Sequence, residues 1–169
     1  MFKKNSLRFQ IFLSMTLLVL VAFAILAFVM VGQYQKQALE YHDERLIDKE
    51  KQIKMQIQYV FSQTTFPVDT HYIPLIFRED IYSIANIQNL NFALYDLDGV
   101  LLKSSKASMS PDQDAFFIPY SILQELSSTL DKRIVEQHEF AGRGYQTSYT
   151  YITDLQFKPI AILHIPYFE

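Results

Sequence analysis

The sequence predicts an α+β protein in which a membrane-spanning helix continues into a long helix and is followed by an antiparallel five-stranded sheet with short helices. Three observations support this fold class: an uncharged apolar run over residues 11–31, a stretch without glycine or proline over residues 33–63, and short apolar runs separated by turn residues after residue 90. We therefore divide the chain into a tip (1–10), a transmembrane helix (11–31), a long helix (32–63) and a domain (64–169).

The apolar run predicts a membrane anchor. It holds 21 residues without a charge, and at ~1.5 Å per residue it spans roughly 30 Å, the thickness of a bilayer's hydrocarbon core. A core helix is the first alternative, but a domain of this size rarely buries a helix that is apolar all round. A cleaved signal peptide is the second, but it needs a shorter run and an A-x-A-like site, whereas this run ends in Phe-Val-Met-Val.

The distribution of charge predicts the orientation. Lys3, Lys4 and Arg8 precede the run, whereas all 18 acidic residues and 12 basic ones follow it, which gives the part after Val31 a net charge of −6. Lysine and arginine near a span stay on the cytoplasmic side. We therefore expect a cytoplasmic N-terminus and a periplasmic or extracytoplasmic domain at the inner membrane, and no binding of nucleic acid through bulk charge.

The residues that usually hold metals are sparse and scattered. Cysteine is absent and the four histidines lie far apart in the chain, so we expect no metal, no cofactor and no cysteine nucleophile.

The long helix carries half of a heptad pattern. Leu39, Leu46, Ile53 and Val60 recur every seven residues, but the positions three before them are mostly polar. Two interpretations stay open: a helix packed on its own domain, and the seam of a signalling dimer.

Asn91–Lys103 predicts a β-hairpin. Asp98-Gly99 is a favoured pair for a two-residue type I′ turn. Such a turn would pair Leu97 with Val100 and Tyr95 with Leu102, with those four side chains and Ala93 on a buried face. The same argument makes Asp96 a structural residue.

The remaining elements follow from periodicity and turn residues. We expect helices over 75–87 and from Pro119 to about Leu130, loops over 64–74 and 103–114, and a closing meander of strands over 133–140, 145–154 and 160–168 with a turn over 141–144. The second helix places Ile122, Leu123, Leu126 and Leu130 on one face.

Aromatic residues in the predicted strands are candidates for ligand binding. Tyr145, Tyr149 and Tyr151 share one face of a strand, and His164 alternates with Ile162 on the last strand. Tyr95 and Arg143 complete the candidate set. The alternative for all of them is plain core or interface packing.

The whole pattern resembles a known family. The K-x-x-x-x-R tip, the long helix, FREDIYSIANIQNLNFALYDLDGVLLKSS and the closing SYTYITDLQFKPIAILHIPYFE together resemble the N-terminal part of bacterial membrane sensor histidine kinases, with their PAS-like or Cache-like sensor domain. The resemblance implies signal input to a two-component phosphorelay, a homodimer, an unknown small-molecule or envelope signal and, through a kinase core beyond Glu169, a response regulator. We expect no catalytic residue in this chain.

Two other functions stay open. A small anchored envelope adaptor would show the same features without a kinase. Asp96-Leu97-Asp98-Gly99 also matches the first motif of haloacid-dehalogenase-type phosphatases, but the partner residues and the parallel sheet of those enzymes are not apparent.

Overall fold

The computed structural model describes residues 7–106, 116–140 and 143–168, without the side chains of residues 7, 34–43, 140 and 143. The chain forms two compact units, Met1–Arg45 and Leu46–Glu169, which we describe separately. Helix α1, Leu7–Gln63, belongs to both units. Most of the expected loop over 103–114 and the first half of the expected turn over 141–144 lie outside the described residues. The expectation was wrong for residues 103–104, which belong to a strand over 101–104, and for residues 143–144, which begin a strand over 143–153.

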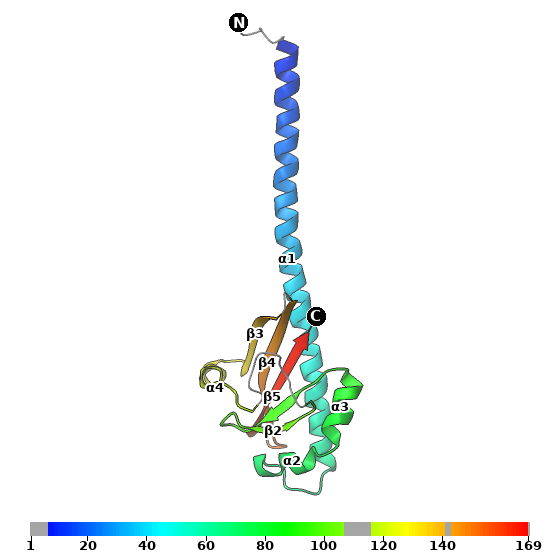
Figure 1. Cartoon of the computed structure of the whole chain (residues 1–169), viewed down its shortest axis with the longest axis vertical. Coiled ribbons are helices and arrows are strands. Elements are labelled where there is room, and N and C mark those ends of the chain that lie inside the picture. Colours follow the sequence, from blue (N-terminus) through cyan, green and yellow to red (C-terminus); the bar gives the residue numbers. More distant parts are fainter. Residues whose placement is uncertain (1–6, 107–115, 141–142, 169) are drawn as a thin grey trace. The chain divides into compact units, whose positions relative to one another are not determined.

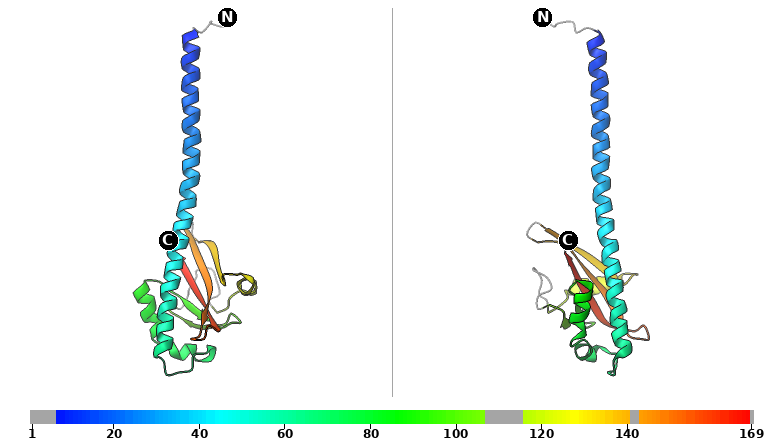
Figure 2. Two further views of the ribbon diagram at one scale, coloured as in Figure 1. Left: turned by 180° about the vertical axis from the view of Figure 1, so that it is seen from behind. Right: turned by 90° about the vertical axis from the view of Figure 1, so that its right-hand side faces the viewer.

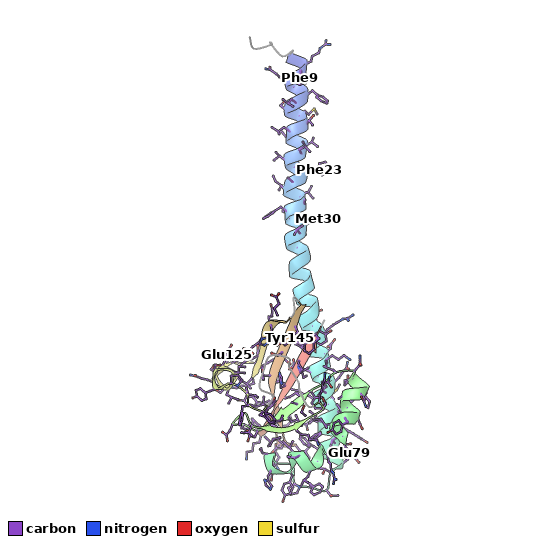
Figure 3. All side chains as sticks on the ribbon, viewed as in Figure 1. Phe9, Phe23, Met30, Glu79, Glu125 and Tyr145 are labelled. Carbon is purple, nitrogen blue, oxygen red and sulfur yellow. The ribbon has the colours of Figure 1, made fainter. Side chains whose placement is uncertain are left out.

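The first unit contains the apolar half of α1. In the described part of the chain, Arg8–Gln33 is the one helical stretch long and apolar enough to cross a membrane, and none of its apolar window is buried by protein. Phe9, Phe23 and Met30 project from it (Figure 3). Ser14 and Thr16 donate their hydroxyls to the carbonyls of Ile11 and Phe12 at 3.0 and 2.8 Å. The helix thus satisfies its own polar groups, as a lipid environment requires.

The second unit is built on a five-stranded antiparallel sheet (Figure 1). Its strands are β1 (Ala93–Tyr95), β2 (Leu101–Ser104), β3 (Arg133–Phe140), β4 (Arg143–Thr153) and β5 (Pro159–Phe168), in the spatial order β2-β1-β5-β4-β3. The α+β class and the closing meander β3-β4-β5 are confirmed. The last strand, β5, lies between the first strand and β4, which unites the two hairpins in one sheet.

One face of the sheet packs against α1 and α3 (Asp80–Gln88), as the views in Figure 2 show. Leu46, Ile53 and Ile57 of α1 are fully buried there, against a sheet face that carries Leu94 and Leu163. Lys49 also donates from α1 to the carbonyl of Gln88, the last residue of α3, at 2.9 Å. A cation at a helix C-terminus is favourable because the carbonyls there are otherwise unpaired.

The helix expected over 75–87 is two helices. The 3₁₀ turn η1 (Thr70–Tyr72) leads into α2 (Ile73–Ile76), and α3 begins only at Asp80. Asn89 ends α3 with a left-handed backbone, φ 50°, a conformation that asparagine tolerates better than most residues.

The opposite face is covered by α4 (Tyr120–Ser128), from which Ile122 and Leu126 are buried against Tyr95, Tyr149 and Ile162. The expectation for Leu130 was wrong. The helix ends at Ser128, and Leu130 is 96% exposed.

The hairpin of β1 and β2 forms, but not with the expected turn. Among described non-glycine residues φ is positive only at Asn89, Lys132 and Phe157, so Asp98 cannot occupy a type I′ turn, which needs positive φ at both central residues. Instead Asp96 and Val100 close a three-residue loop in which Gly99 has φ 83°. Tyr95 pairs with Leu101 rather than Leu102, across a bulge. Leu101 therefore shares the face of Tyr95, while Leu97 and Val100 are exposed.

The hairpin of β4 and β5 repeats this turn. Asp96 accepts from the backbone N–H groups of Asp98 and Val100 through Oδ1 at 3.0 and 2.7 Å. Asp154 accepts in the same way from Gln156 and Lys158, at 2.8 Å each. Phe157 takes the left-handed place of Gly99, with φ 64°. Both turns thus use an aspartate to satisfy backbone donors.

Candidate functional site

The sheet brings the candidate ligand-binding residues onto one face. Tyr145, Tyr149 and Tyr151 alternate along β4, where they pair across the sheet with Phe168, His164 and Ile162 of β5. Since facing residues of neighbouring strands point to the same side, and Tyr95 pairs with Ile162 from the other flank, the described candidates share the face that α4 covers. We call Tyr95, Tyr145, Tyr149, Tyr151 and His164 the aromatic face.

Ring stacking organises the aromatic face into two rows. In the first row His164 lies against Tyr149, with ring centroids 4.6 Å apart, and against Tyr95 at 6.0 Å. In the second row Tyr145 stacks between His138 of β3 at 5.0 Å and Phe168 at 4.9 Å. Figure 3 marks the position of Tyr145 on the sheet.

Polar groups lie between the two rows. Thr147 is fully buried, and its Oγ1 lies 3.0 Å from Nε2 of His138. The same nitrogen lies 3.5 Å from Oε2 of Glu136, which is buried without a hydrogen bond. Sequence reasoning missed Glu136, His138 and Thr147. Thr147 lies between Tyr145 and Tyr149 on β4, so alternation along that strand was the signal for it. Glu136 and His138 alternate with Ile134 on β3, and the pairing of β3 with β4 is needed to place them on the aromatic face.

His164 is the least satisfied polar side chain of the aromatic face. It is 3% exposed, and neither ring nitrogen has a hydrogen-bond partner. Burial, with a smaller contribution from His138, lowers its pKa to about 4. The ring is therefore neutral at physiological pH, with one donor and one acceptor available. Burial likewise raises the pKa of Tyr95 to about 12 and that of Tyr149 further still, so both phenols keep their protons.

The remaining candidates are placed less completely. Arg143 begins β4, but its side chain lies outside the described residues. Tyr151 is half-buried and packs against the same cluster as Tyr149. The face therefore combines flat aromatic surfaces with an imidazole, a carboxylate and hydroxyls, and its central residues Tyr95, Tyr149 and His164 are buried.

The helix residues proposed for a dimer seam are used inside the domain. Leu46 and Ile53 are fully buried, and Val60 packs against the same core. The side chain of Leu39 lies outside the described residues. Of the two interpretations that the heptad left open, packing on the domain itself therefore holds for Leu46 and Ile53, and association of α1 needs other side chains.

Comparison of the chain with protein-family models and with curated proteins finds no match to either.

Proposed function

We propose that this chain is the signal-input portion of a bacterial two-component sensor histidine kinase. In this proposal α1 anchors the chain in the inner membrane with its N-terminus in the cytoplasm, and the sheet domain is a periplasmic, PAS-like or Cache-like sensor that works as a homodimer. A kinase core encoded beyond Glu169 would pass phosphate to a response regulator.

The observation that carries the proposal is that a single helix, α1, supplies both the apolar stretch and part of the core of the domain. The same helix contains the apolar stretch Arg8–Gln33 and the buried core residues Leu46 and Ile53. A change in the packing of the domain must therefore act on the helix that continues into the apolar stretch. Such a shift or tilt is a plausible two-state element for signalling.

Neighbouring residues of β4 link the aromatic face to α1. Tyr149 points to the aromatic face, and the next residue, Thr150, points to the other face, because successive side chains of a strand alternate. There Thr150 Oγ1 accepts a hydrogen bond of 2.7 Å from Nζ of Lys54 on α1. Gln58 of α1 donates to the carbonyl of Thr153 at 2.8 Å. A ligand that moves Tyr149 would thus move two polar contacts of α1.

The first test is to read the coding sequence past Glu169. A second apolar span, a phosphoacceptor-histidine helix and an ATP-binding domain are expected. A stop codon there would contradict the kinase proposal and favour the anchored adaptor.

The second test uses the full-length protein in membrane vesicles. Tyr149→Phe and Lys54→Met are expected to change the level of autophosphorylation, whereas the exposed control Lys106→Met should behave as the wild type. Equal autophosphorylation in all of these proteins would contradict the proposed route through β4.

The structure gives the phosphatase alternative no support. The sheet is antiparallel throughout, and Oδ1 of Asp96 already accepts two backbone hydrogen bonds in its turn. The adaptor remains the second candidate, because several large apolar side chains of the domain are exposed, among them Phe157.

A further inference from the structure

A groove of about 830 Å³ lies between α1 and the end of the β4–β5 hairpin. Its walls are largely apolar, with Ile47 and Met55 from α1 and with Leu155 and Phe157 from the hairpin loop. Of the aromatic face, Tyr151 also lines this groove, whereas Tyr95, Tyr145, Tyr149 and His164 do not. We call this hollow the α1–hairpin groove. Its volume falls within the range of roughly 300–1,000 Å³ that is usual for ligand pockets.

The floor of the groove holds an unpartnered acceptor. Glu50 lines the groove although its residue is only 4% exposed. Oε2 accepts a hydrogen bond of 2.6 Å from Nε of Arg133, whereas Oε1 is buried and has no hydrogen-bond partner. A buried carboxylate oxygen without a donor is costly. An occupant of the groove whose N–H or O–H group displaced the atoms that cover Oε1 would therefore satisfy this oxygen.

The charges that line the groove favour an anion as the second part of the occupant. Lys51, Lys54 and Arg133 line it together with Glu50 and Asp154. Arg133 pairs with Glu50 at 2.6 Å, which leaves two lysines against the carboxylate of Asp154, so the lining as a whole carries an excess of one positive charge. Burial lowers the pKa of Lys54, and a nearby anion would offset this effect of burial.

Phe157, in the wall of the groove, is strained and exposed. Its backbone is left-handed, as is that of Gly99 at the equivalent position of the β1–β2 turn. A non-glycine residue in this conformation costs about 1–2 kcal/mol. Its side chain is 86% exposed, so packing inside the domain does not offset the strain. Strained residues cluster at sites of function, and an aromatic side chain beside an apolar groove is suited to hold a ligand.

We propose that the α1–hairpin groove binds the carboxyl-terminal end of a peptide with an apolar last residue. The last backbone N–H would bond to Oε1 of Glu50, the terminal carboxylate would lie near Lys51 and Lys54, and the last side chain would contact Met55 and Phe157. A free amino group fits less well, since it would meet Lys51 and Lys54, and Glu50 is already paired with Arg133. The proposal does not depend on the sensory role, because an adaptor would use the same groove.

The test uses the full chain in lipid nanodiscs. The probe is the peptide Gly-Ser-Gly-Leu-Leu with an N-terminal fluorophore and a free carboxylate, and binding is measured by fluorescence anisotropy against empty nanodiscs. Two matched probes isolate the contacts: the C-terminal carboxamide lacks the anion, and a depsipeptide with an ester at the last linkage lacks the N–H donor. We expect saturable binding of the first probe, weakened about tenfold or more with each matched probe.

Variants of exposed residues test the walls without disturbing the core. Lys51→Glu and Phe157→Gly are each expected to weaken binding about tenfold, whereas Lys106→Glu and Ile87→Ser, at exposed positions outside the groove, should bind as the wild type does. Equal binding of carboxylate, carboxamide and depsipeptide would overturn the proposal. So would unchanged binding in both groove variants, or the absence of saturable binding.

Discussion

Tyr149 and His164 stack across β4 and β5 with ring centroids 4.6 Å apart and planes inclined by 11°. The two residues face each other directly in the sheet, so the stack also links β4 to β5, the strand that pairs with β1. The histidine is held without a hydrogen bond to either ring nitrogen. Protonation of this ring would therefore place a positive charge in the core without a hydrogen-bonded carboxylate to stabilise it.

We expect acid to destabilise the domain through His164. Burial lowers its folded pKa to about 4 from the ordinary 6.5, so the unfolded chain binds a proton at higher pH than the folded one. Stability is therefore full above pH 6.5 and is lost as the pH falls towards 4, by up to about 3 kcal/mol. Urea unfolding of the chain in detergent, followed by near-ultraviolet circular dichroism across this range, measures the loss.

The matched variant is His164→Phe, which keeps a ring against Tyr149 and removes the titrating nitrogens. It should lose most of the pH dependence between 6.5 and 4 and be at least as stable at pH 7, because an unsatisfied buried polar group is removed. If His164→Phe shows the same dependence on acid as the wild type, His164 is not the group responsible for it.

Features that depend on residues close together in the chain could be predicted from the sequence, whereas features that depend on distant residues could not. The apolar run, the long helix and the meander follow from local periodicity, and the alternation of Tyr145, Tyr149 and Tyr151 placed them correctly on one face. The position of β5 beside β1 is a contact between segments about 70 residues apart, and no local pattern encodes it. Glu136 and His138 were missed for the same reason, since only the register across β3 and β4 brings them to Thr147.

The errors at the first hairpin have a different physical cause. Asp-Gly favours a type I′ turn, but the same dipeptide also fits a three-residue loop with glycine last. The side chain of Asp96 selects the longer loop by accepting from the backbone of Asp98 and Val100. The shift moved Leu101 to the face assigned to Leu102. The sequence signal for the three-residue loop is therefore the aspartate two residues before Asp98-Gly99, whose side chain can accept hydrogen bonds from the turn backbone.

Asp96 is expected to be structural. Asp96→Ala removes the acceptor of two backbone hydrogen bonds and should cost about 1–3 kcal/mol of unfolding free energy, whereas Asp96→Asn keeps an acceptor oxygen and should cost less. The corresponding pair at Asp154 is the matched control, because the turn is the same. Magnesium-dependent phosphatase activity that disappears in Asp96→Asn would contradict this role.

The part of the chain from about Gln33 to Glu169 is expected to be a monomer or a weak dimer in solution. Leu46 and Ile53 are fully buried in the domain's own core, so they are not available to a partner helix, and the apolar stretch Arg8–Gln33 should add much of the association. Sedimentation velocity on this part, compared with the full chain in detergent, checks the expectation. A tight dimer of the shortened chain in dilute solution would show that a seam exists elsewhere on its surface.

The twin turns predict opposite outcomes at equivalent positions. Gly99 has φ 83°, and a Cβ there would lie 3.0 Å from Cδ1 of Leu123 and 3.2 Å from Cβ of Ile118. Gly99→Val should therefore lose about 2–4 kcal/mol from strain and overpacking. Phe157→Gly relieves the same left-handed strain at an exposed site and should leave the stability unchanged or raise it by up to ~1 kcal/mol, since the gain is opposed by the entropy of glycine.

Asp98→Asn is the neutral control beside Gly99, because its side chain is exposed and the turn uses its backbone N–H. Thermal melting of the three variants in one detergent decides the comparison. A Gly99→Val protein that melts with the wild type would show that the turn does not need a left-handed residue, and a Phe157→Gly protein that melts well below it would show that Phe157 packs within its own chain. In that second case packing within the domain would offset the strain at Phe157, and the strain would no longer support a binding role for this residue.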